Sequence, residues 1–508
     1  MLLLGISIST GVSAQKGPIL PLDDSVFWAY QALVARGLMP PRNIADFPIK
    51  ESVFAAAIEA GLSLNETANG AQLKPFLSPL ASRLFSTSVF KDNSFGIRLR
   101  PGVTIANQES KDFLRPELNP KNVAYSLLSF ESWFTAGSFT AAWGWRHDRY
   151  YDRDPEGMDT AHRWAIRPEN AYISYDGKYA QVMVGRVRRH FGPYDSPGLF
   201  LSDNARPMDH LSLTLGTDQL NVHTVLSELD SITGDGRFTG IAGDDSVRAG
   251  SERRYLAVHK FSYQVNEVWT AGITHSILYS GANSNLSFKY INPFHLAILS
   301  VDEKPKNDEN NGLIGAFFDA QQPGMMVSGQ LAVDDLDILN GREPASIAAS
   351  ISGYFANVLP HTDLSANATI VTGRTYNAEQ PEGKYLYLNR GIATQYSDFA
   401  HFALAMPVFL REGIHVTPKV DILLQGEGDI KSPFPGHEDS PAIFDGVTEL
   451  TIRPSLSANA LLPNRLDLSA GIGVNLRSNA AHARDASETE VSGYFSVGYR
   501  FMWNGRLK

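Results

Sequence analysis

The chain has 508 residues, a formal net charge of −10 at pH 7 and no cysteine. The absence of cysteine excludes a disulfide framework and thiolate chemistry, and the negative charge argues against nucleic acid as a bulk electrostatic partner. No apolar run approaches the roughly 18–20 residues that a membrane helix needs, so any membrane-spanning structure must be a β-barrel.

The first residues have the character of a targeting segment. An apolar run over residues 2–12 ends in Val12-Ser13-Ala14, a pattern of small residues typical of a cleavage site. We therefore expect a secretory signal peptide over residues 1–14.

Residues 15–91 show apolar side chains at helical spacing. Helices are predicted from about Asp24 to Arg36 and from Asp46 to Gly61, and a third, proline-interrupted stretch follows around residues 77–84. The apolar faces of this small helical region need a partner, which the rest of the chain must provide.

From about residue 92 to the C-terminus, the connections between predicted strands alternate between short and long. The eight short links lie at residues 136–138, 176–178, 216–218, 264–267, 321–324, 360–363, 411–413 and 463–465. The nine long, polar stretches lie near residues 108–121, 150–167, 188–207, 229–250, 280–311, 334–344, 375–389, 426–445 and 478–488. These links join about eighteen strands, and an even strand number with tight periplasmic turns and long extracellular loops is typical of outer-membrane barrels.

The chemistry of the strands agrees with a membrane barrel over residues 92–508. In the last strand, Phe501 and Trp503 share one face while Arg500 falls on the other. A packed protein core would not accept Arg500 or Asp467 without matched partners, whereas a wet lumen accepts both. Pro454 lies inside an otherwise regular strand and has no backbone N–H to donate to the neighbouring strand, which predicts a β-bulge there. We expect the helical region to lie in the periplasm or in the barrel mouth, docked on the lower rim.

The segment from Gly185 to Pro207 carries the candidate binding residues. It leaves a predicted strand and gathers basic and aromatic side chains in an otherwise acidic chain: Arg186, Arg188, Arg189, His190, Tyr194 and Arg206. Arginine binds carboxylates and phosphates bidentately, and tyrosine can stack on sugar rings. Two interpretations stay open: a contact surface for an acidic polysaccharide where the loop folds over or into the barrel, or arginines that balance lumen carboxylates beside a solvated loop.

A second long segment runs from Tyr290 to Gly312 and has an apolar middle, so we expect it to fold inward as a plug. Its acidic end lacks the ligand spacing of an EF-hand and is interpreted as a solvated charge run. The chain has no G-x-S-x-G, H-E-x-x-H or Walker A motif. We therefore expect no catalysis, no metal and no cofactor.

Taken together, the helical region, the eighteen strands, the Asn204-Ala205-Arg206-Pro207 motif and the Tyr290–Gly312 segment resemble the Wzi-type capsule-assembly outer-membrane family. The resemblance covers nearly the whole mature chain. It implies a barrel occluded by a loop and by the helical region, which acts without catalysis as a surface lectin that anchors capsular polysaccharide.

We accordingly expect a monomer in the cell outer membrane, with long loops outside the cell and helices in the periplasm. The expected partners are an acidic surface polysaccharide and outer-membrane lipids, and no nucleic acid. A substrate-selective channel for anionic oligosaccharides is the alternative, and an outer-membrane hydrolase is a weaker one.

Overall fold

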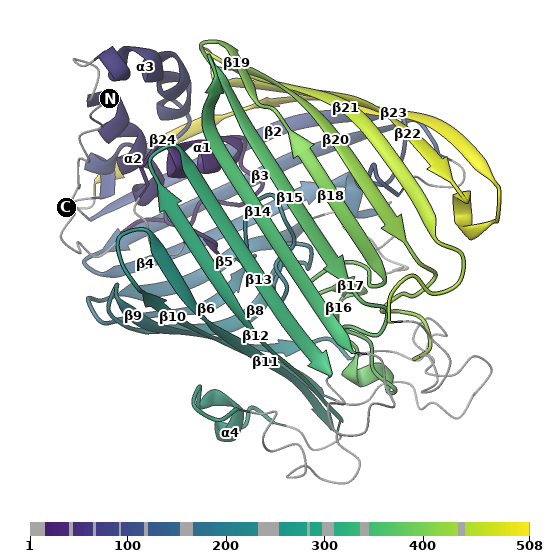
Figure 1. Ribbon diagram of the computed structural model, residues 1–508. Helices are drawn as coiled ribbons and strands as arrows, with labels where there is room; N and C mark the ends of the chain where they lie inside the picture. The colour runs from purple at the N-terminus through teal and green to yellow at the C-terminus, as the bar shows by residue number, and fades with distance from the viewer. Residues whose placement is uncertain are drawn as a thin grey trace.

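The computed structural model describes residues 16–39, 44–63, 68–90, 93–115, 120–152, 166–231, 253–281, 285–296, 309–335, 345–434 and 442–506. The expected signal peptide, residues 1–14, lies outside the described residues. The chain forms a closed antiparallel barrel with a helical unit at one end, near both termini (Figure 1). No helix in this described part of the chain is long and apolar enough to cross a membrane.

The barrel wall consists of eighteen strands, as the sequence predicts. Its labelled segments are β2 Ser94–Ala106, β3 Val123–Ala136, β4 Phe139–Asp148, β5 Ile166–Asp176, β6 Ala180–Val187, β8 Met208–Gly216, β9 Leu220–Leu229, β10 Arg253–Gln264, β11 Trp269–Gly281, β12 Glu309–Gln322, β13 Met325–Asp335, β14 Ser346–Leu359, β15 Thr362–Val371, β18 Phe399–Ala405, β19 Val408–Arg411, β20 Ile414–Gln425, β21 Glu449–Leu462, β22 Leu466–Ser478, β23 Ser487–Tyr499 and β24 Phe501–Arg506. Two of the eighteen are broken strands, β18 with β19 and β23 with β24. The barrel closes because β2 pairs with β3 on one side and with β23 and β24 on the other.

The alternation of connections is confirmed along the whole wall. Each of the eight predicted short links joins two neighbouring strands, from β3–β4 to β21–β22, and each predicted long stretch falls between strands that lack a short link. All tight turns therefore lie at one rim of the barrel, here called the short-turn rim, and all long connections at the other, the long-loop rim.

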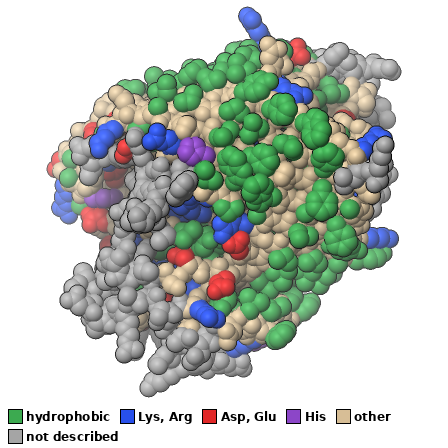
Figure 2. Space-filling model, turned by 180° about the vertical axis from the view of Figure 1, so that it is seen from behind, with side chains coloured by type: hydrophobic (Ala, Val, Ile, Leu, Met, Phe, Trp, Pro, Cys, Tyr) green, Lys and Arg blue, Asp and Glu red, His purple; other side chains and the backbone are tan. Residues whose placement is uncertain are grey.

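The faces of the strands also follow the prediction. Phe501 and Trp503 are exposed on the outer wall, while Arg500, which precedes them, is buried inside. Apolar side chains cover much of the outer face (Figure 2). Because an apolar outer wall around charged interior positions is the pattern of a membrane barrel, the side chains support the same architecture as the topology.

The predicted bulge at Pro454 is not present. β21 pairs with β20 in unbroken register through Val420 and Pro454. Its pairing with β22 skips Arg453 and Pro454 and then resumes without a shift. The missing proline N–H is therefore accommodated by a local gap in one ladder rather than by an extra residue, and the bulge prediction is wrong.

The helical unit consists of η1 Phe27–Ala29, α1 Tyr30–Ala35, α2 Glu51–Ser63, α3 Ala68–Ala81 and η3 Thr87–Phe90. Its apolar core continues onto wall residues Met326, Tyr354 and Leu461 next to the tight turns. The turn residue Gly324 donates its N–H to the Ala35 carbonyl at 2.8 Å, and Gly413 donates to Pro75 at 3.3 Å. The short-turn rim thus covers the apolar faces of the helices.

Two long connections fold into the lumen and form what we call the lumen plug, residues 188–207 and 372–398. The plug contains β7 His190–Phe191, which pairs with β1 Asp46–Phe47, and also η6 Pro381–Gly383, β16 Leu386–Tyr387 and β17 Arg390–Gly391. Phe200, Tyr376 and Tyr385 pack there against wall residues such as Val258 and Leu278. The expectation of a polar outer loop over residues 375–389 is therefore wrong, because Tyr376 and Tyr385 are fully buried.

The expected plug over Tyr290–Gly312 is also corrected. The described residues 285–296, with α4 Phe288–Ile291, lie outside the wall beside β11 (Figure 1). Residues 309–312 already belong to β12, and residues 297–308 lie outside the described part. The remaining short helices, η4 Arg149–Asp152 and η7 Ala480–His482, lie in long connections.

Candidate functional site

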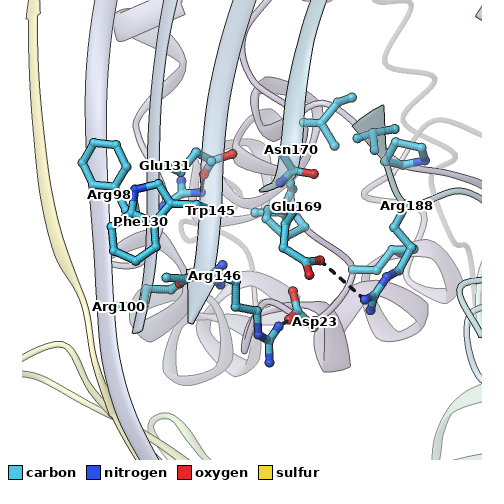
Figure 3. A pocket seen from close by; sticks show the side chains of 18 residues that line it. Asp23, Arg98, Arg100, Phe130, Glu131, Trp145, Arg146, Glu169, Asn170 and Arg188 are labelled. Atoms are coloured by element: carbon cyan, nitrogen blue, oxygen red, sulfur yellow. Dashed lines mark hydrogen bonds and ion pairs between the residues drawn. The ribbon is translucent and has the colours of Figure 1, made fainter. Parts of the chain in front are cut away.

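A charged pocket lies in the lumen between strands β2–β5 and the N-terminal residues 19–23. The polar side chains that line it include Asp23, Arg100, Arg146, Glu169, Asn170 and Arg188 (Figure 3). Its cavity volume is about 40 Å³, and the space between its walls, open solvent included, is about 560 Å³.

The floor of the pocket is set by strand periodicity, because alternate residues of β2 and β3 face the lumen. Arg98 donates to Glu51 of α2 at 2.5 Å and to Glu131 of β3 at 2.8 Å. The second carboxylate oxygen of Glu131 is buried and has no hydrogen-bond partner among the described residues. A buried acceptor of this kind suits a ligand hydroxyl or a water molecule.

One side of the floor is fixed by the helical unit. Arg100 donates to the Asp24 carboxylate at 2.9 Å and to the Ser129 hydroxyl at 3.0 Å. Arg500 donates to the same carboxylate at 2.7 Å. Burial alone would raise the pKa of Asp24, but Arg500, Arg100 and Arg98 together hold it well below its usual range. Asp24 therefore stays ionised and keeps Arg100 oriented at the pocket.

A β-bulge shapes the wall of the pocket. Gly144 of β4 pairs with Asn170 of β5, whereas the next residue, Trp145, pairs with Pro168, so Glu169 is an extra residue. A bulge re-aims side chains and breaks the inward–outward alternation. As a result, the consecutive residues Glu169 and Asn170 both line the pocket.

Arginines complete the rim of the pocket. Arg146 forms ion pairs with Asp23 and, at 2.8 Å, with Asp148. Arg188 lies 3.5 Å from the carboxylate of Glu169, as the dashed line in Figure 3 shows. The side chains of Arg146 and Arg188 are only partly buried, so their guanidinium groups retain exposed surface.

The lining holds nearly balanced charges, with four arginines (Arg98, Arg100, Arg146, Arg188) and three carboxylates (Asp23, Glu131, Glu169). Guanidinium groups donate hydrogen bonds and carboxylates accept them. The pocket is therefore equipped to hold a hydroxyl-rich ligand through donors and acceptors together. Among the described residues, no group of three or more His, Asp or Glu side chains could hold a metal ion.

The structure divides the six residues proposed from sequence among three places. Arg188 is the one that lines the pocket. Arg186 pairs with Asp209 on the outward side of β6 and β8. Arg186 lies at the long-loop end of β6, and Arg206 lies in the connection that leads into β8.

The remaining three residues lie inside the lumen plug. Arg189 donates to His210 at 2.7 Å and lies 3.3 Å from His223. Burial lowers the pKa of Arg189 to about 10, so it remains charged at neutral pH. His190 lies 3.0 Å from the Asp203 carboxylate.

Tyr194 is also buried, and its ring stacks on Phe27 of the helical unit with centroids 5.4 Å apart. These contacts join the lumen plug to the wall and to the helical unit. Arg189, His190 and Tyr194 are therefore placed to orient neighbouring segments rather than to face solvent.

Four residues that line the pocket were not predicted from the sequence: Asp23, Arg100, Glu169 and Asn170. Arg98 and Arg100, two residues apart in the first strand, were a usable signal for an inward-facing charged row. The bulge at Glu169 was marked only by the neighbouring Pro168, a residue that favours strand irregularities.

Comparison with known proteins gives one family and one close fold. Residues 83–327 match the family model of the capsule assembly protein Wzi. The structure of Wzi from Escherichia coli is described as an outer membrane protein involved in group 1 capsule assembly and as a carbohydrate-binding β-barrel. It is 10% identical, covers 96% of this chain and 100% of its own, and has a TM-score of 0.62.

Weaker similarities exist to OccAB4 of Acinetobacter baumannii, with 8% identity and a TM-score of 0.46, and to opdK of Pseudomonas aeruginosa, with 10% identity and a TM-score of 0.44. Both alignments cover 81% of this chain and 99% of the other. No curated protein sequence matches the chain. Residues 83–327 thus match the model of the Wzi capsule-assembly family, and the chain shares the barrel fold of the E. coli protein.

Proposed function

We propose that this protein is a carbohydrate-binding barrel of the outer membrane that anchors surface polysaccharide and performs no catalysis. The match of residues 83–327 to the Wzi family model and the carbohydrate binding described for the E. coli protein support the proposal. The observation that carries it for this chain is a lumen filled at two levels, by the helical unit at the short-turn rim and by the lumen plug above it.

The lumen plug is bonded to the wall at many points, which favours a fixed binding scaffold over a diffusion channel. Arg254 of β10 donates to the Lys384 carbonyl at 2.6 Å. The Tyr385 hydroxyl donates to the Ser276 hydroxyl of β11 at 3.1 Å. The Tyr376 hydroxyl donates to the Leu199 carbonyl at 2.7 Å and so joins the two segments of the plug. Buried hydrogen bonds of this kind are costly to break because their partners would be left unsatisfied.

The ligand we propose is an acidic surface polysaccharide. Arg188 would contact a sugar unit in the pocket, and Arg186 and Arg206 would contact further units along the long-loop rim. A repeating polyanion gains affinity from several weak contacts through multivalency. In this assignment the buried residues Arg189, His190 and Tyr194 hold the plug in place. The long-loop rim would face the cell exterior and the helical unit the periplasm.

The direct test is retention of purified acidic capsular polysaccharide by the protein in lipid nanodiscs. The variant R188Q/R206Q should bind at least several-fold more weakly than the unmodified protein. The matched control is R411Q, which removes an exposed arginine from a turn at the opposite rim. Equal binding by all three proteins would overturn the assignment of the arginines.

A second experiment separates anchoring from transport. With the lumen filled at two levels, the protein in a planar bilayer should show no resolvable single-channel conductance at moderate voltage. Stepwise openings that added anionic oligosaccharide blocks would show instead that the protein is a substrate-selective channel.

A further inference from the structure

Residues 285–296, here called the strap, lie against the outer wall of the barrel. The lumen side of β9 and β10 is identified by His223 and Lys260, which approach Asp46 of the interior at 3.1 Å and 3.9 Å. The neighbouring residues Thr224 and His259 consequently point outward. His259 contacts the strap, so the strap is on the outer face, as the position of α4 in Figure 1 also shows.

The strap covers the half of β9–β11 that lies nearest the long-loop rim. Outward-facing wall residues beneath and beside it are buried: Leu226, Tyr255, Ala257, Ile277 and Tyr279. On the same strands, outward residues nearer the short-turn rim are exposed: Leu220, Tyr263, Trp269 and Ile273. The change occurs within β11, where Ile273 is 51% exposed and Ile277 only 3%. The strap therefore shields the outward-facing residues of that half of the three strands from the surroundings of the barrel.

The covered wall carries two imidazoles, and a carbonyl group of the strap lies within hydrogen-bond distance of the Nε2 atom of each. The Nε2 atom of His259 lies 2.9 Å from the Tyr290 carbonyl, and that of His275 lies 3.0 Å from the Pro293 carbonyl. The Tyr290 ring packs on Tyr279 at 4.3 Å. Polar groups without partners are expensive in hydrocarbon, so two successive hydrogen bonds to strap carbonyls make this stretch of wall compatible with a membrane.

The outer side of the strap carries large apolar side chains beside the exposed polar residues Asn285 and Asn292. Phe288 is 89% exposed and Phe294 is 77% exposed. Leu286 is exposed as well. Three large apolar side chains thus project from a short segment whose polar backbone groups are used on the side that faces the wall.

The bilayer should reach the height of the strap, because exposed apolar residues approach the long-loop ends of other strands. Ile452 on β21, Leu476 on β22 and Val491 on β23 are all exposed and lie within four residues of those ends. On β11, Ile277 is likewise four residues from Gly281 but is covered. The exposed apolar residues of the outer wall form a lipid-facing belt. This belt continues across β9–β11 only if the strap supplies its surface there.

We propose that the strap is the lipid-contacting surface over this sector of the barrel, with Phe288 and Phe294 inserted among acyl chains of the leaflet on the long-loop side. The occupant is a lipid surface, because the large exposed side chains of the strap are apolar and continue the apolar belt of the outer wall. This surface is separate from the pocket and from polysaccharide binding.

The chain has no cysteine, so a single nitroxide label can be placed at any chosen position. F288C and F294C are labelled, assembled in bilayers, and tested by electron paramagnetic resonance for collision with oxygen, which concentrates in lipid, and with a water-soluble nickel chelate. I273C, on the bare outer wall, is the lipid control, and A483C, in the β22–β23 loop, is the water control. Heat-modifiable migration on gels verifies that each variant has assembled.

The strap labels should resemble I273C, with oxygen collisions exceeding nickel collisions several-fold. Labels that resemble A483C would show that the strap is in water and would overturn the proposal. Strong dipolar coupling between labels on different chains would also overturn it, because a second copy of the protein would then cover Phe288 and Phe294.

Discussion

Arg98 of β2 donates to Glu51 of α2 across 2.5 Å, and both side chains are fully buried. The pair joins the first wall strand to the helical unit in the lumen. Arg500 with Asp24 and Arg83 with Asp467 join the same two parts of the molecule at 2.7 Å and 3.0 Å. Removal of one partner from such a pair leaves an uncompensated buried charge, which typically costs about 3–5 kcal/mol.

The first prediction follows from this ion pair. E51A should weaken the docking of the helical unit, because Arg98 would keep Glu131 alone as its acidic partner. Limited proteolysis of the assembled barrel should cut the helical unit at least tenfold faster than in the unmodified protein. E412A, in an exposed turn at the same rim, should leave the rate unchanged. An unchanged rate in E51A would mean that apolar packing alone holds the unit.

The second prediction is that the helical unit is dispensable for assembly of the barrel. The wall closes through pairing of β2 with β3, β23 and β24, and none of these ladders includes residues 20–88. Deletion of residues 20–88 should leave a heat-modifiable barrel in the outer membrane with a lower unfolding temperature, because charged lumen residues such as Asp467 lose partners. Absence of the deleted protein from that membrane, with the signal peptide retained, would contradict this prediction.

The third prediction concerns pH and Asp46, which lies in the lumen at β1. Burial alone would raise the pKa of Asp46, but His223, Lys260 and Arg189 lower it from 3.8 to about 2. The carboxylate therefore stabilises the folded state above pH 3.8, and this contribution is lost as the pH falls through about 2. The shift corresponds to about 2 kcal/mol.

D46N should accordingly lower the free energy of unfolding at pH 7 by an amount of that order, and the difference should shrink between pH 4 and pH 2. Urea titrations of both proteins at several pH values in this range measure the difference in their free energies of unfolding. D485N, in the exposed β22–β23 loop, should follow the unmodified protein throughout. A difference that does not depend on pH would show that Asp46 is not held ionised by its neighbours.

Much of the wall could be predicted from the sequence, because a barrel strand repeats every two residues and a tight turn is a local signal. Phe501 and Trp503 outside and Arg500 inside follow from that period alone. The lumen plug has no such period. Tyr376, Leu388 and Asn389 adopt positive φ angles of 70°, 47° and 65°, so their segment is a series of irregular turns. Only its tertiary contacts distinguish it from a solvated loop.

The candidate pocket was predictable only in part for a related reason. Arg188 lies in a basic segment that is visible in the sequence, whereas Glu169 and Asn170 share one face only because of a bulge in β5. The segment from Tyr290 to Gly312 was predicted to pack inward on the basis of its apolar residues, and its described part before β12 is residues 290–296. It packs outward instead, because the groups that needed hydrogen-bond acceptors, His259 and His275, are on the outer wall.

The fourth prediction concerns orientation in the membrane. Epitope tags inserted at Pro433 or Ala483, in connections at the long-loop rim, should bind antibody on intact cells. Tags at Gly177 or Asn464, in tight turns, should bind only after the outer membrane is permeabilised. The reason is that tight turns of outer-membrane barrels face the periplasm. Surface labelling at Gly177 would reverse the orientation of the protein and place the helical unit outside.

The last prediction separates two adjacent arginines that the sequence could not distinguish. R188Q should reduce binding of acidic polysaccharide and leave the unfolding temperature within about 2 °C, since a partly exposed ion pair contributes only about 0–1 kcal/mol. R189Q should instead lower the unfolding temperature, because it removes a buried donor from His210 and the guanidinium beside His223. Added salt should weaken binding by the unmodified protein, as the Debye length falls to about 8 Å near 0.15 M. It should weaken binding by R188Q less steeply. If R188Q and R189Q lose binding and stability in parallel, Arg188 supports the plug and the polysaccharide binds elsewhere.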